Sequence, residues 1–307
     1  MKKKHNKENN KEHNKEHNKE NNKENNKENN KERMVIALCI SPTGNTKKAL
    51  RALARGVAET ISGGDYFFID ITGEDARRGV YEFGEGDIVL LGCPTYAGRV
   101  PNKLMPYLKE SVFGDGALGI SLVTYGNRAY DDSLKELAYI MKDNDFDLIA
   151  ALAVPSEHAF AHTLATGRPN EGDLNRLRQI GEEIGEVVLS GETKILNPAL
   201  VKGRMPEDMK YYVPKKENGE PASFLKAMPV TDIEKCTGCG ACIEVCPMGC
   251  FNNSITEAEG ICIKCQACIK SCLSNAKSFV DEEFLSHKKF LEINYQKAEH
   301  DIDIYMA

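Results

Sequence analysis

The sequence contains no tryptophan, and aromatic residues together make up only 7% of its 307 residues. Long apolar runs are missing as well, because stretches such as Val35–Ile40 and Leu148–Val154 end well short of the roughly 18 residues that cross a bilayer. The lysine-rich start leads into charged residues and asparagine instead of an apolar segment, so no secretory signal is predicted. We therefore expect a soluble, cytoplasmic protein with no membrane insertion.

The charge is unevenly distributed along the chain. Residues 1–33 repeat a unit of Asn-Lys-Glu with Asn or His, have no apolar residue after Met1, and hold eleven Lys or Arg against seven Glu. Such a segment cannot bury enough surface to offset its ordering entropy, which predicts a disordered low-complexity tail. The rest of the chain is then more acidic than the overall net charge of −6. An acidic body argues against nucleic acid and is compatible with docking to a basic protein partner.

From Met34 the chain alternates short apolar runs with amphipathic segments, which is typical of an α/β domain with a parallel sheet. We assign this domain to residues 34–196 and expect it to be a doubly wound, five-stranded parallel sheet. A connector rich in Pro, Lys and Gly follows at 197–228, then a cysteine-rich unit at 229–282 and a C-terminal tail at 283–307, in which a helix is possible. Strands are predicted at 35–40, 65–69, 87–91, 119–124 and 147–154, and helices at 47–61, 131–142 and 174–189.

Nine of the eleven cysteines lie between Cys236 and Cys272, and eight of these nine form two runs of the form C-x2-C-x2-C-x3-C. A reducing compartment makes such density more typical of metal binding than of disulfides. Three closely spaced thiolates can hold three corners of a [4Fe-4S] cluster, with the fourth ligand supplied from elsewhere. Zinc sites also use four cysteines, usually as two separated C-x2-C pairs, so this pattern favours iron-sulfur. The predicted metal ligands are Cys236, Cys239, Cys242, Cys246, Cys262, Cys265, Cys268 and Cys272.

Residues 229–282 resemble the bacterial-type two-cluster ferredoxins, which are small α+β domains. The resemblance implies that the fourth cysteine is exchanged between the runs, so that Cys246 completes the cluster of the second run and Cys272 completes that of the first. Leu273 departs from the proline that the family usually repeats at this position, which affects the local turn. Cys250 is an extra cysteine, and we interpret it as a buried thiol.

Three loops follow predicted strands at the edge of the sheet where open α/β sheets bind ligands. The first, between a strand and a helix, combines hydroxyls with backbone amides and a helix N-terminus, a combination that suits an anion. It resembles the phosphate loop of the flavodoxins, and the other two resemble the loops that flank the FMN ring. The resemblance implies that FMN is bound by Ser41, Thr43, Gly44, Asn45, Thr46, Pro94, Thr95, Tyr96, Ala97, Gly98, Tyr125, Gly126, Asn127 and Arg128.

Together the two parts resemble a family in which a flavodoxin-like domain precedes a two-cluster ferredoxin. This implies an electron carrier that passes electrons between FMN and two [4Fe-4S] clusters and exchanges them with redox partner proteins. Two alternatives remain open: a flavin-dependent reductase of a quinone or nitro compound, and a non-redox regulatory protein without flavin. Glu157, His158 and His162 have the spacing of a helical metal site, but nearby prolines favour a loop beside the flavin.

Overall fold

Five apolar runs form the parallel strands of one sheet, as the alternating pattern predicts. In the computed structural model, which describes residues 33–307, their hydrogen-bonded order is β7-β6-β4-β1-β2. This is the strand order 2-1-3-4-5 of the flavodoxin-like doubly wound fold. The predicted tail at 1–33 lies almost entirely outside the described residues. The strands are β1 (Val35–Cys39), β2 (Phe67–Asp70), β4 (Ile88–Pro94), β6 (Leu118–Tyr125) and β7 (Asp147–Pro155).

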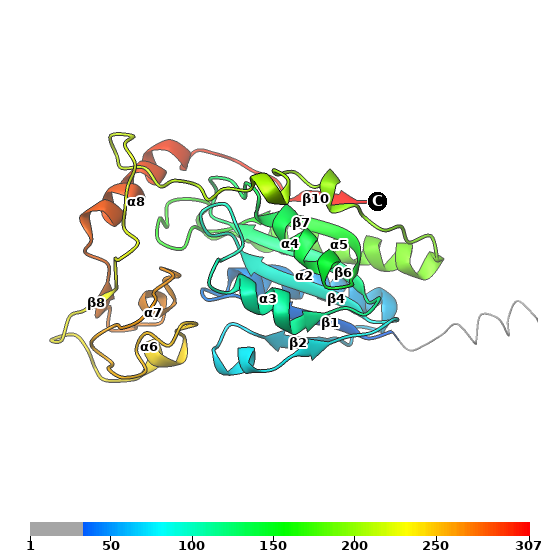
Figure 1. The fold of residues 1–307 in the computed structure, drawn as a ribbon, viewed down its shortest axis with the longest axis horizontal. Helices are drawn as coiled ribbons and strands as arrows, with labels where there is room; N and C mark the ends of the chain where they lie inside the picture. The colour runs from blue at the N-terminus through cyan, green and yellow to red at the C-terminus, as the bar shows by residue number, and fades with distance from the viewer. Residues whose placement is uncertain (1–32) are drawn as a thin grey trace, which may run out of the picture. The chain divides into compact units, whose positions relative to one another are not determined.

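Helices cover both faces of this sheet (Figure 1). On one face, α2 (Asn45–Ile61) and α5 (Glu171–Ser190) pack on side chains such as Ala37. On the other face, α3 (Met105–Ser111) and α4 (Ser133–Asp143) cover the side chains that alternate with them. Because both faces are buried, the strands carry continuous apolar runs.

Glycines bring α2 and α5 into direct backbone contact. A Cβ on Gly56 would lie 2.0 Å from the carbonyl oxygen of Arg178, and one on Gly181 would lie 2.3 Å from that of Leu53. No side chain fits at either position, so the two helices approach as closely as their backbones allow. This close packing fixes α2, whose first turn starts at the predicted phosphate loop.

A sixth strand was not predicted from the sequence. Residues Asp303–Met306 form β10, which pairs antiparallel with β7 and makes it an interior strand. The chain reaches this position from α8 (Glu282–Tyr295), and Figure 1 shows the red C-terminal segment returning from that helix to the sheet. The helix that seemed possible in the tail is therefore present, and the residues after it belong to the sheet. Also unpredicted are α3 and a small parallel pair of β3 (Tyr81–Glu82) with β5 (Val112–Phe113).

The cysteine-rich part is built from two similar halves. Each cysteine run contains a four-residue helix, α6 (Ala241–Glu244) or α7 (Ala267–Lys270), and β8 (Val230–Thr231) pairs antiparallel with β9 (Lys277–Ser278). Short 3-10 helices occur at η1 (Asp75–Arg78), η2 (Pro198–Leu200) and η3 (Pro206–Asp208).

The segment 197–228 packs closely on the α/β part. Val201 is buried in the same core as α4, and the Arg204 guanidinium binds the buried carboxylate of Asp132 at 2.6 Å. Farther along, the Tyr212 amide donates to the Ala97 carbonyl at 2.8 Å. This segment thus forms part of the wall around the predicted site.

Candidate functional site

The predicted phosphate loop connects β1 to α2 through a left-handed turn at Gly44, where φ is +89°. Ser41 stabilises this turn, because its Oγ accepts a hydrogen bond from the Lys47 amide at 3.0 Å. The Thr46 hydroxyl reaches the Thr124 hydroxyl at 2.7 Å and so ties the loop to the end of β6. The first amides of a helix have no acceptor within the helix. Ser41 satisfies the Lys47 amide, and the Asn45 and Thr46 amides before it are placed to bind an anion.

The loop after β4 is a tight turn. The Tyr96 amide donates to the Arg99 carbonyl at 2.9 Å, and the Arg99 amide donates back at 3.1 Å. Gly98 adopts φ +77°, and a Cβ there would lie 2.2 Å from a carboxylate oxygen of Asp131. Glycine is therefore required where this loop meets the loop after β6.

The loop after β6 is held by the C-terminal segment. The side-chain amide of Asn127 donates to the carbonyls of Tyr295 at 3.0 Å and Ala298 at 2.8 Å. Its own carbonyl lies 3.1 Å from Nε2 of His300. The Asn127 side chain therefore points to the segment that leads to β10, and it holds the loop after β6 through that segment.

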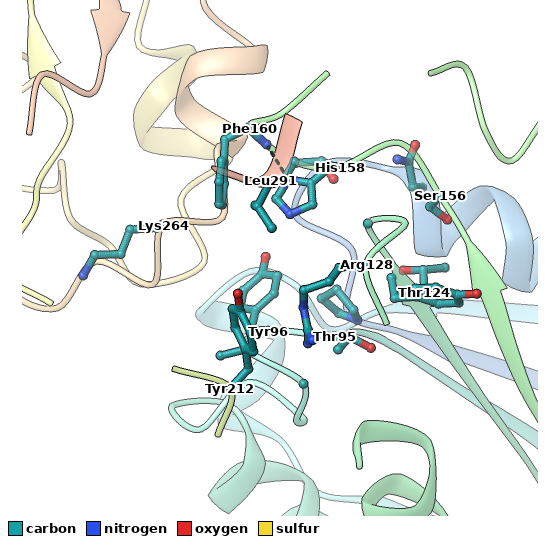
Figure 2. Close-up of a pocket in the computed structure, with 18 of the residues that line it drawn as sticks. Thr95, Tyr96, Thr124, Arg128, Ser156, His158, Phe160, Tyr212, Lys264 and Leu291 are labelled. Carbon is teal, nitrogen blue, oxygen red and sulfur yellow. Dashed lines mark hydrogen bonds between the residues drawn. The ribbon is translucent and has the colours of Figure 1, made fainter. Parts of the chain in front are cut away.

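All three loops open into one cavity of about 230 Å³ (Figure 2). Every predicted flavin-loop residue except Ser41, Gly44 and Asn127 lines it. Part of the remaining wall comes from the loop that the sequence predicts beside the flavin, with Ser156, Glu157, His158, Ala159 and Phe160. Sequence reasoning did not connect the other wall residues with the site, because they lie far away along the chain. These residues are Tyr212, Pro214, Phe224, Ile263, Lys264, His287 and Leu291.

His158 is a neutral hydrogen-bond donor in this wall. Its Nδ1 lies 3.4 Å from the Phe160 amide and 3.3 Å from the Ala161 amide and accepts from them, which leaves the proton on Nε2. Burial lowers the pKa of His158 to about 3, with the nearby His287 and His162 contributing. The ring faces the cavity interior in Figure 2. An N–H group aimed into the cavity can donate to a ligand there.

The possible metal site at Glu157, His158 and His162 does not assemble as one cluster. His162 is exposed and lies 3.1 Å from the Glu157 carboxylate, whereas His158 is turned into the cavity. The segment is a loop, as predicted. Only His158 of the two histidines lines the cavity.

Tyr212 contributes a buried hydroxyl that has no hydrogen-bond partner among residues 33–307. Its ring is covered by the Arg128 guanidinium, whose central carbon lies 3.8 Å from the ring centroid. A buried polar atom without a partner is costly unless something else satisfies it. Because Tyr212 lines the cavity, this hydroxyl indicates a polar ligand group nearby.

The two cysteine loops repeat the same backbone path. Left-handed conformations occur at Gly238 and Gly240 in the first run and at the equivalent Lys264 and Gln266 in the second. In the second run this turn directs an amide toward sulfur, because the Lys264 amide lies 3.4 Å from Sγ of Cys262. Amides that point at thiolates stabilise them and tune a bound cluster.

A second cavity is lined by Cys246, Cys262, Cys265 and Cys268. Cys246 comes from the first run and the other three come from the second, which is the ligand set that the ferredoxin resemblance implies. The donor set therefore fits a [4Fe-4S] cluster of the exchanged type. Of the remaining set, Cys236 and Cys272 are partly exposed, Cys239 is exposed and Cys242 is buried.

The two cavities are adjacent. Ile263 and Lys264 lie between the predicted ligands Cys262 and Cys265 in sequence, and both line the first cavity. Tyr96 reaches the same place: burial raises the pKa of its hydroxyl well above the usual value, and the thiols of Cys265 and Cys262 add to the effect. We call the cysteine set around the second cavity the proximal set, and Cys236, Cys239, Cys242 and Cys272 the distal set.

Residues 229–252 match the 4Fe-4S binding domain family. The chain carries a ferredoxin-type 4Fe-4S domain. It is also 30% identical over 94 residues to an uncharacterized ferredoxin of Methanocaldococcus jannaschii. That similarity covers 26% of this chain and 62% of the relative, so the chain spans less than two thirds of the relative's length. The family match includes the first cysteine run, and the second run lies beyond it.

Among solved structures, a flavodoxin from the domain Archaea matches with 15% identity and a TM-score of 0.32, covering 51% of this chain and 99% of that chain. The Megasphaera elsdenii flavodoxin matches with 16% identity and a TM-score of 0.30, covering 49% and 99%. Rubredoxin oxygen:oxidoreductase from Desulfovibrio gigas matches with 17% identity and a TM-score of 0.32, covering 53% and 37%. We assign the flavodoxin-like fold from the strand order of the sheet.

One further sequence feature is explained by the fold. Gly114-Asp115-Gly116-Ala117-Leu118-Gly119 has the glycine spacing of a dinucleotide-binding loop, but it leads into β6 instead of a helix. It therefore lies at the edge of the sheet opposite the cavity. In the part of the chain that the structure describes, no helix is long and apolar enough to cross a membrane.

Proposed function

We propose that this protein carries electrons between FMN in the first cavity and two [4Fe-4S] clusters held by the proximal and distal cysteine sets. One observation supports this most directly. Ile263 and Lys264, which separate two proximal cysteines, line the same cavity as the three flavodoxin-type loops. Flavin and cluster would then be neighbours within one chain.

The residues of the cavity fit FMN part by part. The loop at Thr43–Thr46, with the first turn of α2, would hold the phosphate, because its amides and hydroxyls favour an anion. Tyr96 and the loop at Tyr125–Arg128 would flank the ring. The free Tyr212 hydroxyl and the Nε2–H of His158 would satisfy polar atoms of the ligand. When bound, FMN supplies a centre that takes one or two electrons, which complements the one-electron chemistry of iron-sulfur clusters.

The arrangement also suggests an order of electron flow. The proximal set lies beside the flavin cavity, whereas the distal set includes the exposed Cys239. Leu273, which follows the distal ligand Cys272, is 95% exposed. We therefore assign exchange with redox partner proteins to the distal cluster, and exchange with FMN to the proximal one.

An anaerobic cofactor count tests this proposal first. We expect about eight iron, eight sulfide and one FMN per chain, since each ferredoxin-type cluster has four irons. Stopped-flow reduction then follows the flavin and cluster absorbances separately. Clusters that fill and empty while the flavin signal stays constant would contradict electron transfer between them. Eight iron without flavin after careful reconstitution would instead support a regulatory role for the α/β part.

The wall around His158 favours a second candidate function, the reduction of a small quinone or nitro compound at the flavin. Phe160, Phe224 and Leu291 make this wall apolar, and His158 offers one N–H donor within it. Such a surface suits a flat organic acceptor with a polar group. The test is oxidation of the reduced protein by a panel of these compounds, with His158→Phe as the variant. Absence of turnover across the panel argues against this activity and leaves the carrier proposal intact.

A further inference from the structure

Five thiols line the second cavity, although a [4Fe-4S] cluster needs only four ligands. The fifth belongs to Cys250, which is 4% exposed and packs with Phe251 in the core of the cysteine-rich part. Its amide donates to Sγ of Cys246 at 3.3 Å, and its own sulfur lies 3.4 Å from the Ile261 carbonyl. Cys250 is therefore held beside the proximal ligands, and it belongs to neither the proximal nor the distal set.

The second half of the repeat supplies an internal comparison. Ala276 follows Cys272 by four residues, as Cys250 follows Cys246, and its amide donates to Sγ of Cys272 at 3.2 Å. The residue before each also matches, because Gly249 and Asn275 both adopt positive φ, at +62° and +53°. The two positions share backbone geometry and differ in one side chain. The proximal half has a thiol where the distal half has a methyl group.

This thiol is within reach of two ligand sulfurs. Cys250 lines the same cavity as the ligands Cys246 and Cys262, and its backbone amide already contacts Sγ of Cys246. The S–H group has one proton, so it can point either to the Ile261 carbonyl or to a ligand sulfur. A thiolate bound to a cluster carries negative charge, and a hydrogen bond to a charged acceptor is the stronger of the two.

We propose that the thiol of Cys250 donates a hydrogen bond to the ligand sulfurs of the proximal cluster and raises its reduction potential above that of the distal cluster. This inference rests on the proposed function, because it needs both clusters in place. A reduced cluster holds more negative charge on its sulfurs, so a donor beside them stabilises the reduced form. The consequence is a downhill step from the distal cluster to the one beside the flavin cavity.

Reciprocal variants of the full chain test this. Cys250→Ala reproduces the side chain of the distal half, and Ala276→Cys introduces a thiol there. We expect Cys250→Ala to shift one of the two cluster midpoint potentials to a more negative value and leave the other in place. Ala276→Cys should shift the other potential to a more positive value. The measurement is an anaerobic redox titration followed by electron paramagnetic resonance and visible absorbance, with iron counted in every variant.

Cys250→Ser serves as the conservative control, since a hydroxyl retains a donor, and its potential should lie between those of the wild type and Cys250→Ala. Two unchanged potentials in a Cys250→Ala protein that keeps eight iron would overturn the inference. Loss of half the iron in that variant would also overturn it, because Cys250 would then be a ligand. Failure of the proposed function looks different: the wild-type chain itself would lack the second cluster.

Discussion

Single residues define the shape of the first cavity, which is the proposed FMN site, and Gly98 is the clearest case. It sits where the loops after β4 and β6 touch, with a left-handed backbone and no room for a Cβ beside Asp131. His158 acts differently, through its protonation state, because its Nδ1 accepts from the backbone and its ring is buried. Both roles lead to measurable consequences.

We expect Gly98→Ala to destabilise the protein by roughly 1–3 kcal/mol, since the added methyl group forces a loop shift on top of the cost of the left-handed conformation. FMN binding should weaken in parallel because Gly98 lines the cavity. Denaturant unfolding and flavin titration measure the two effects. Gly79→Ala is the matched control, because Gly79 has φ −90° and open space around its Cβ position. Equal stability of the two variants would contradict this account.

His158 makes stability depend on pH with a defined sign. Its pKa is lowered from 6.5 to about 3 in the folded protein, so the unfolded chain binds the proton more readily. Above pH 6.5 the ring is neutral in both the folded and the unfolded chain, and the protein has its full stability. As the pH falls from 6.5 toward 3, the ring takes up a proton in the unfolded chain but not in the folded one, so stability is lost. Between pH 7.5 and pH 5.5 we expect the wild type to lose about 1.4 kcal/mol more stability than His158→Gln.

The measurement is denaturant unfolding of both proteins at the two pH values under anaerobic conditions. Acid effects on clusters and on His287 are common to both proteins and cancel in the comparison. The same loss in wild type and variant would show that His158 is not the group responsible.

At the scale of elements, the C-terminal segment after α8 connects the two parts of the chain. β10 pairs with β7, the Tyr130 hydroxyl is close to the Tyr305 hydroxyl at 3.0 Å, and Asn127 holds the backbone at Tyr295 and Ala298. The loop after β6 is thus positioned by a strand that arrives last in the sequence. Ordering this loop costs backbone entropy that β10 helps to offset.

Deletion of residues 302–307 should therefore weaken FMN binding about tenfold, which corresponds to about 1.4 kcal/mol. Hydrogen exchange at residues 125–130 should accelerate at the same time, because the loop loses its support. Deletion of Ala307 alone is the control, since that residue is exposed and follows the end of β10. Unchanged exchange in the longer deletion would mean that the loop is held by α8 alone.

At the scale of the molecule, the α/β part and the cysteine-rich part meet at Arg77. Its guanidinium donates to the Thr72 carbonyl on one side and to the Pro247 carbonyl on the other, next to the proximal ligand Cys246. It also donates to the Ile71 carbonyl at 3.2 Å. One side chain therefore links the end of β2 to the proximal cysteine set.

We expect Arg77→Ala to slow electron exchange between flavin and clusters about tenfold while the midpoint potentials stay the same, because a small misplacement of two centres has a large kinetic cost. Arg78→Ala is the neighbouring control, since Arg78 is mostly exposed and forms an ion pair with Asp75 at 3.1 Å, within its own turn. Stopped-flow reduction measures the rates. Equal rates in the two variants would show that the Arg77 contact is not what aligns the two parts.

Local patterns predicted most of the fold. The five parallel strands and the helices α2, α4 and α5 follow from buried apolar runs and period-3.6 segments, and their observed bounds lie within a few residues of the predicted ones. β10 escaped prediction although Asp301-Ile302-Asp303-Ile304 alternates polar and apolar residues, because so short a run forms a strand only when it pairs with β7. The short α3 was missed for a similar reason, since its seven residues depend on packing of Leu108 against the sheet.

The amino-acid sequence by itself determined which candidate ligand groups the chain offers, because cysteine spacing and the Ser-Pro-Thr-Gly-Asn-Thr loop are local features that need only a few neighbouring residues. Tertiary structure decided what surrounds that chemistry. It placed Ile263 and Lys264 in one cavity with the three loops after β1, β4 and β6, turned His158 inward, and directed Asn127 to the C-terminal segment. These placements depend on which distant surfaces can bury apolar area together, and no local pattern encodes that.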